Sequence, residues 1–105
     1  MIKSSTMMLT SAILTVAMVT SALPAFAYTG ERLAKNAKVT IVEARSIALR
    51  ARPGKITDEE LEKEKGGSGL RYSFDVQSGS VTYEVGVDAQ TGKVLENKKE
   101  GPNPD

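Results

Sequence analysis

The chain has 105 residues and a mass of 11.2 kDa, and it contains neither histidine nor cysteine. This length fits one small domain. The missing residue types exclude a Cys/His metal site, a Ser-His-Asp triad, a thiol nucleophile and a disulfide framework. Fourteen Lys and Arg against thirteen Asp and Glu give a formal net charge of +1. The chain therefore lacks the excess of basic residues that is typical of nucleic-acid-binding proteins.

Residues 1–27 have the features of a secretory signal peptide. Lys3 gives a positive start, residues 7–23 carry no charge, and Ala25-Phe26-Ala27 fits the small-x-small rule for cleavage after Ala27. A membrane anchor is the alternative, but a spanning helix needs about 20 predominantly apolar residues, and Ser and Thr interrupt this stretch repeatedly. We therefore expect a mature chain that begins at Tyr28, is periplasmic or secreted, and has no stable membrane insertion. It is formally neutral because Lys3 is removed.

Residues 28–37 are polar and predict a partly ordered lead-in with at most a frayed helical turn. A helix is predicted to follow, because Thr40 and Glu43 form a capping box in which each side chain can accept from the other's free backbone N–H. Pro53-Gly54 ends this helix, since proline disfavours helical dihedral angles in the residue before it. The apolar residues at helical spacing predict its buried face: Ile41, Ala44, Ile47, Ala48 and Ala51, widened by Val42 and Leu49.

The segment Lys55–Lys65 is ambiguous. Thr57 and Glu60 form a second capping box and the charged residues around them favour a helix, yet such a helix would bury little beyond Ile56 and Leu61. In a regular strand Ile56 and Leu61 would point to opposite faces, so a strand requires a bulge or a bend between them. The residue pattern by itself leaves both structures open.

The next two segments predict an antiparallel hairpin. A flexible connection at Gly66–Gly69 comes first, and it lacks the ending of a phosphate-binding loop. Apolar and polar residues then alternate in Leu70–Val76 and again in Val81–Val87, which is the pattern of half-buried strands. Gln77–Ser80 provides the turn between them.

The end of the chain predicts one more strand. A second turn, with Gly92 suited to a positive φ, leads into a short strand at Val94 and Leu95, and residues 98–105 form a polar tail. The sequence therefore predicts an α+β domain in which one helix packs on a small antiparallel sheet. Four charged residues of the hairpin are expected to face water on the opposite sheet face: Arg71, Asp75, Glu84 and Asp88.

Several of these segments resemble a PepSY domain: Val39–Ala44, Ile47–Leu49, Pro53–Ile56, Glu60–Glu64, Tyr72–Val76 and Tyr83–Leu95. The ending of the last segment, Val-Asp-Ala-Gln-Thr-Gly-Lys-Val-Leu, is the most specific. The resemblance covers residues 38–97. It implies a cystatin-like arrangement of one helix on an antiparallel sheet, and it makes Lys55–Lys65 a strand. PepSY domains also occur in propeptides of thermolysin-type metalloproteases, where they are linked with inhibiting the protease or assisting its folding, and in small secreted and envelope proteins of bacteria.

On this resemblance we expect a non-catalytic binding module that modulates or inhibits a peptidase in trans and needs no cofactor. An exposed sheet edge or a loop would capture the partner protein. An unpaired edge strand also allows self-association, so we expect a monomer or an edge-strand dimer. Alternating polar residues on a sheet are usually only its solvated face. The candidate contact residues are Arg71, Tyr72, Asp75, Glu84 and Asp88.

Two other function classes compete with this hypothesis. The acidic run Asp58–Glu64 raises the alternative of an envelope domain that senses a small ligand or a cation, but it lacks the spacing of a calcium loop and neighbouring lysines neutralise it. Catalysis by a carboxylate pair or a Ser-Lys dyad has no pocket to support it in so short a chain. We therefore expect neither a metal site nor an enzyme.

Overall fold

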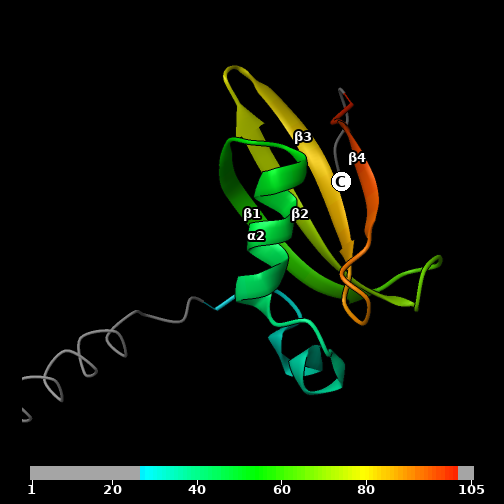
Figure 1. Ribbon diagram of the computed structural model, residues 1–105. Helices are drawn as coiled ribbons and strands as arrows, with labels where there is room; N and C mark the ends of the chain where they lie inside the picture. The colour runs from blue at the N-terminus through cyan, green and yellow to red at the C-terminus, as the bar shows by residue number, and fades with distance from the viewer. Residues whose placement is uncertain (1–26, 102–105) are drawn as a thin grey trace, which may run out of the picture.

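The computed structural model describes residues 27–101, so the predicted signal peptide lies outside the described residues except for Ala27. Four strands form one antiparallel sheet in the order β1-β2-β3-β4, and the helix α2 lies across one of its faces (Figure 1). This confirms the predicted α+β fold. Among residues 27–101 no helix has the length and apolar character to cross a membrane. The elements are η2 (Glu31–Asn36), α2 (Ile41–Ala51), β1 (Lys55–Lys63), β2 (Leu70–Ser78), β3 (Val81–Asp88) and β4 (Val94–Lys99).

The helix α2 begins at the predicted capping box. The Glu43 backbone N–H donates to Thr40 Oγ1 at 3.1 Å, and the Thr40 backbone N–H donates to Glu43 Oε1 at 2.8 Å. Ala44 and Ala48 are fully buried, because small side chains let the helix approach the sheet closely. The prediction that Val42 widens the buried face is wrong. Two residues from Ala44, it lies about 200° around the helix, and it is 66% exposed.

The strand β1 resolves the ambiguity of the acidic segment. Its register on β2 shifts between Ile56 and Asp58, which is the bulge that the opposite parity of Ile56 and Leu61 requires. Ile56 is therefore opposite Val76 and Leu61 opposite Tyr72, and both side chains reach the core. Pairing with β2 has overridden the helical propensity of this segment.

The strand β4 is longer than predicted. Asn97 pairs with Val85 and Lys99 pairs with Tyr83, so residues 98 and 99 belong to the sheet and not to a polar tail. The N–H of Glu100 also donates to the carbonyl of Thr82 at 2.9 Å. A strand of mostly polar residues is stable here because its backbone groups form hydrogen bonds with β3, and these bonds do not depend on the side chains.

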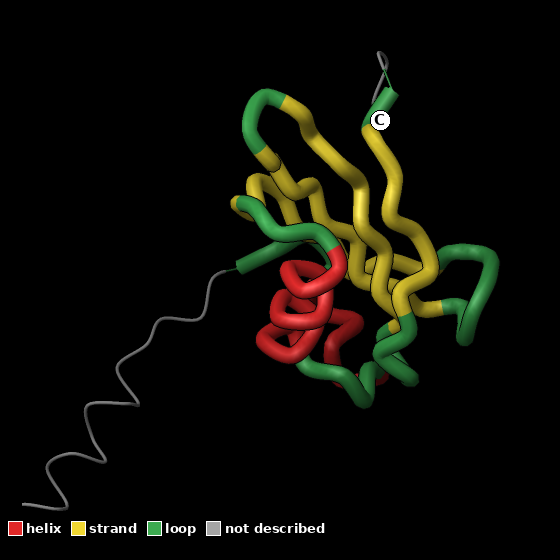
Figure 2. The backbone as a smooth tube through the Cα atoms, turned by 45° about the horizontal axis from the view of Figure 1, so that its top comes forward, coloured by secondary structure: helices red, strands yellow, loops and turns green. Residues whose placement is uncertain are grey.

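Figure 2 shows the helix α2 against one face of the sheet. The side chains of the hydrophobic core lie between them. Tyr72 and Phe74 are its largest buried side chains, with rings 6.4 Å apart and stacked. Residues 28–37, predicted as a partly ordered lead-in, are built into the domain. They include the 3-10 helix η2 at Glu31–Asn36, and four of their apolar residues pack against the core: Tyr28, Leu33, Ala34 and Ala37. These contacts all arise within residues 28–101, so this part of the chain carries its own core.

Candidate functional site

The sheet face away from α2, here called the open face, gathers most of the predicted contact residues. Three cross-strand rows follow from the strand registers: Asp58–Asp75–Glu84–Lys98, Glu60–Ser73–Gly86–Glu96 and Glu62–Arg71–Asp88. The structure therefore brings together Arg71, Asp75 and Glu84, which are all partly exposed. The face carries a clear excess of carboxylates over basic side chains.

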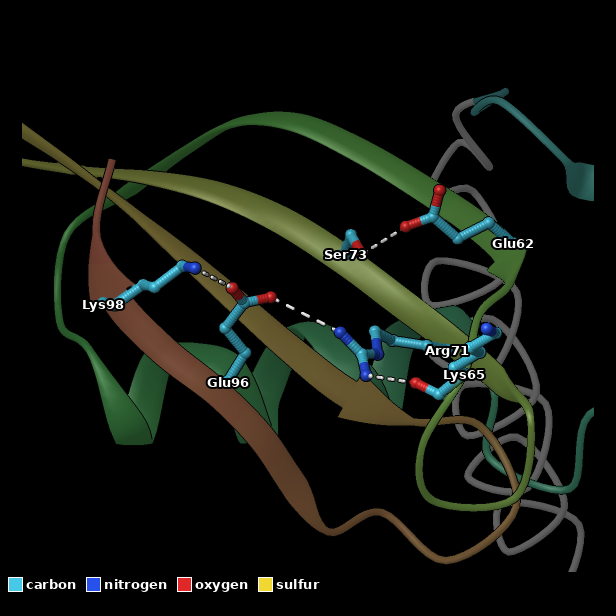
Figure 3. A network of polar contacts seen from close by, with 6 residues as sticks. All are labelled: Glu62, Lys65, Arg71, Ser73, Glu96 and Lys98. Carbon is cyan, nitrogen blue, oxygen red and sulfur yellow. Dashed lines mark hydrogen bonds and ion pairs between the residues drawn. The ribbon is translucent and has the colours of Figure 1, made fainter. Parts of the chain in front are cut away.

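Arg71 is held in place across the open face (Figure 3). Its Nη1 lies 3.4 Å from Glu96 Oε1, and its Nη2 donates to the carbonyl of Lys65 at 3.2 Å. Lys98 Nζ completes the network at 3.0 Å from Glu96 Oε2. The Arg71 stem lies against Gly86, where an added Cβ would come within 3.0 Å of Arg71 Cδ. Gly86 thus leaves room for Arg71 to lie flat, with its guanidinium fixed between a carboxylate and a carbonyl.

The carboxylates of the open face disfavour one another. Burial first, and then the charge of Asp58, raise the pKa of Asp75. Burial also leads the causes that raise the pKa of Glu84, followed by Glu96 and Asp75. Glu60 has a raised pKa as well, from burial and then from Glu62, Asp58 and Asp75. A positively charged group placed on this face would relieve that repulsion.

Asp88 corrects the sequence analysis, because it does not face water. It is 1% exposed, and its carboxylate accepts hydrogen bonds from the backbone N–H groups of Ser68 at 2.6 Å, Gln90 at 2.8 Å and Thr91 at 3.0 Å. Burial by itself would raise the pKa of Asp88, but these bonds outweigh it and lower the pKa to about 2. Asp88 ties the β1–β2 loop to the β3–β4 turn and is not available as a surface contact.

Tyr72 is the second correction among the candidate contacts. Its side chain is 1% exposed and lies in the core beneath α2, where the hydroxyl donates to the carbonyl of Val39 at 2.7 Å. Burial first, and then the neighbouring Tyr28, raise the pKa of Tyr72 to about 12. Tyr72 occupies one of the apolar positions of the alternating pattern in β2, and these positions face the core. The alternation was therefore the signal that this side chain is buried.

Sequence reasoning did not place several residues on the open face, among them Asp58, Glu60, Glu62, Glu96 and Lys98. Glu62 Oε2 accepts from the Ser73 hydroxyl at 2.8 Å, and Glu96 joins Arg71 to Lys98. The signal was the alternation of Asp58, Glu60 and Glu62 within the acidic run. It can be interpreted only once that run is known to be a strand, because a helix would spread the same residues around its circumference.

The outer edge of β1 is bordered by two hollows. One groove of about 500 Å³ is lined by residues that include Tyr28, Arg45 and Ile56, with Thr57, Asp58 and Glu59. A second groove of about 640 Å³ runs past Leu33 and Lys63. Between them Thr29 forms a parallel bridge with Glu60. Arg45 closes the inner wall of the first groove, because its guanidinium forms a two-point ion pair with the Glu59 carboxylate.

The site offers an extended surface on which another molecule could bind. Within residues 27–101 no group of three acidic side chains is placed to hold a metal ion. The carboxylates on the open face point outward along a sheet in rows, and the two grooves follow its edge. Such an arrangement can contact another macromolecule over a flat surface or along a strand.

Comparison with known proteins identifies the domain. The family model for the peptidase propeptide and YPEB domain, PepSY, matches residues 38–98. The matched residues run from just before α2 to the next-to-last residue of β4. No curated protein and no solved structure gives a significant match.

Proposed function

Because the chain belongs to the PepSY family, we propose that it is a non-catalytic binding module that acts on a peptidase in trans. The observation that carries the proposal is the extent of the match, which includes the helix and almost the whole sheet. The family description itself names peptidase propeptides. We further propose that the protein is exported and that cleavage after Ala27 leaves Tyr28 as its first residue.

The open face supports a binding role. Its side chains are fixed before any partner arrives: Arg71 by Glu96 and Lys65, and Glu62 by Ser73. Preorganised side chains lose little conformational freedom on binding, so more of the contact energy remains as affinity. Burial is the first cause of the raised pKa values of Asp75 and Glu84, and neighbouring carboxylates are the second. A basic partner surface would relieve this second contribution.

The test is to add the chain from Tyr28 to Asp105 to a panel of thermolysin-type metallopeptidases and to follow hydrolysis of a short peptide substrate. We expect a stoichiometric change in rate and a complex on size-exclusion chromatography. The double variant Asp75→Lys/Glu84→Lys should weaken the effect at least tenfold, because it places like charge against a basic surface. The matched control Lys35→Glu/Lys38→Glu changes the helical side and should leave the effect unchanged.

An unchanged rate and the absence of a complex across the panel would contradict the peptidase role. The export proposal has its own test, which is N-terminal sequencing of the protein recovered from the periplasm or the medium. Tyr28 at the first position is the expected result, and a chain that still begins at Met1 would contradict it.

A further inference from the structure

The outer edge of β1 ends the sheet, and residues 28–30 cross it at its middle. β1 is the first strand in the sheet order, so one side of its backbone has no strand beside it. The Leu61 N–H points to that side, and the alternation of a strand directs the backbone groups of Glu59 and Lys63 the same way. Among the described residues one backbone hydrogen bond reaches this edge, from the Leu61 N–H to the Thr29 carbonyl at 2.8 Å.

The protein itself shows that this edge accepts another chain segment. Thr29 bridges Glu60 in parallel orientation, and the chain turns away at once through Gly30, whose φ is 82°. A Cβ at Gly30 would overlap the carbonyl oxygen of Leu61, so the backbone of this segment lies directly against the edge. The bridge covers the middle of β1, and the two grooves continue along the edge on either side of it.

Charge decides which segment fits. On the open side of β1 the edge presents Asp58, Glu60 and Glu62, while Glu59 on the helix side is already neutralised by Arg45. The lysines of β1, Lys55 and Lys63, lie at the two ends of the strand, and the carboxylates lie between them. A second β1 would bring like charges together, which disfavours an antiparallel pair of two copies through this edge. An extended segment with basic side chains on one face would meet the three carboxylates.

We propose that an extended, lysine- or arginine-bearing segment of a partner protein displaces the Thr29 bridge and adds to the outer edge of β1 as a fifth strand, with Asp58, Glu60 and Glu62 selecting its charge. The backbone groups of Glu59, Leu61 and Lys63 then supply the pairing, and the grooves receive side chains from the incoming strand. This inference deepens the proposed binding function and rests on it, but it does not require the partner to be a peptidase.

The test is a titration of the ¹⁵N-labelled chain Tyr28–Asp105 with the peptide acetyl-Val-Lys-Val-Lys-Val-Lys-Val-amide. We expect chemical-shift changes concentrated in β1 and slower amide hydrogen exchange at Glu59 and Lys63. Two variant peptides remove the backbone donors of one strand edge each. In the first the backbone nitrogens of the valines are methylated, and in the second those of the lysines are methylated. One of these two peptides should bind at least tenfold more weakly than the parent. A peptide with glutamate in place of lysine should show no binding.

Protein variants separate the edge from the open face. Asp58→Asn/Glu60→Gln should weaken binding of the lysine peptide at least fivefold, and added salt should narrow the difference because these charges are near solvent. Asp75→Asn/Glu84→Gln is the matched control, since it removes two carboxylates from the same face but on β2 and β3, away from the edge strand. Equal weakening by this control would place the peptide on the open face and overturn the proposal.

Other outcomes also overturn it. Three results would each exclude a partner strand at this edge. They are chemical-shift changes centred on β4, equal affinity for the parent and both N-methylated peptides, and self-association of the chain through β1 in sedimentation. The result is distinguishable from failure of the proposed function. If the peptide binds but the chain has no effect on peptidases, strand addition at β1 is supported and the peptidase role is excluded. If the chain forms a peptidase complex that leaves β1 unperturbed, only strand addition at β1 is excluded.

Discussion

Asp75 and Asp88 occupy equivalent polar positions on the two strands of one hairpin, yet the fold treats them in opposite ways. Burial acts to raise the pKa of both carboxyl groups. Beside Asp75 stands another carboxylate, Asp58, and the pKa stays raised. Around Asp88 three backbone N–H groups converge, and the pKa falls to about 2. Removal from water therefore does not set the ionisation of an aspartate in a sheet; the groups that replace the water do.

The same contrast separates a structural residue from a binding residue. Asp88 uses its charge inside the molecule, where it joins two loops that are distant in sequence. Asp75 has no such partner and directs its charge outward, where a basic group would interact favourably with it. Four changes break or sharpen this contrast, and they are ordered by the size of the effect that we expect.

Replacing Asp88 by alanine should have the largest effect. The backbone N–H groups of Ser68, Gln90 and Thr91, whose hydrogen bonds to Asp88 are partly buried, would lose their acceptor, and an unsatisfied buried group costs about 1–3 kcal/mol. We expect the free energy of unfolding to fall by about 3 kcal/mol or more in urea titrations. Asp75→Ala is the matched control, and a loss as large as that of Asp88→Ala would contradict the difference drawn between the two sites.

Acid titration should reveal the Asp88 carboxylate directly. Its folded pKa of about 2 lies below the unfolded value of about 3.9, so its stabilisation is present above pH 4 and is lost as the pH falls from about 4 to about 2. The expected loss is about 2 kcal/mol. Asp75, Glu60 and Glu84 act in the opposite sense, because their raised pKa values give stability that is present at low pH and lost as the pH rises through them.

The variant Asp88→Asn serves as the control for this pH profile. It should show no decline between pH 4 and pH 2 that is attributable to position 88, and the opposite trend of the open-face carboxylates should become visible. Thermal unfolding followed by circular dichroism at a series of pH values measures both. A variant that loses stability in acid as steeply as the parent would exclude Asp88 as the source.

Gly67→Ala should damage the Asp88 site from the other side. Gly67 has a φ of 55°, and a Cβ there would press against Asp88 Oδ2 and a methyl group of Leu95. We expect a loss of about 2 kcal/mol, of which about 1 comes from the left-handed backbone alone. Gly79→Ala is the control, because Gly79 has a φ of 67° and open space around its Cβ position. Equal losses in chemical denaturation would mean that contact with Asp88 adds nothing.

Asp75→Asn should have the smallest effect, and its sign is the test. Removing a charge from the group of carboxylates relieves repulsion at a partly exposed position, so we expect a gain of about 0.5 kcal/mol in the free energy of unfolding at pH 7. The gain should shrink in high salt, where surface charges are screened. Destabilisation by the amide would show that Asp75 has a stabilising partner after all.

Local signals in the sequence were sufficient for much of the fold. The capping box of Thr40 and Glu43 set the start of α2, and the alternation of β2 and β3 predicted the hairpin. The bulge at Ile56 was foreseeable as a condition on a strand, but the choice of a strand over a helix depended on the family resemblance. Within the candidate site, sequence placed Arg71, Asp75 and Glu84 correctly on the open face and misplaced Asp88, whose parity is the same as theirs.

The sequence by itself determined the alternation, the caps and the absence of histidine and cysteine, because each of these is a property of neighbouring residues or of composition. Only the tertiary structure decided that Asp88 is enclosed, that β4 continues through two lysines, and that residues 28–37 join the domain. The physical reason is shared. Each outcome depends on backbone groups or apolar surface supplied by a segment far along the chain, and no local pattern records where that segment returns.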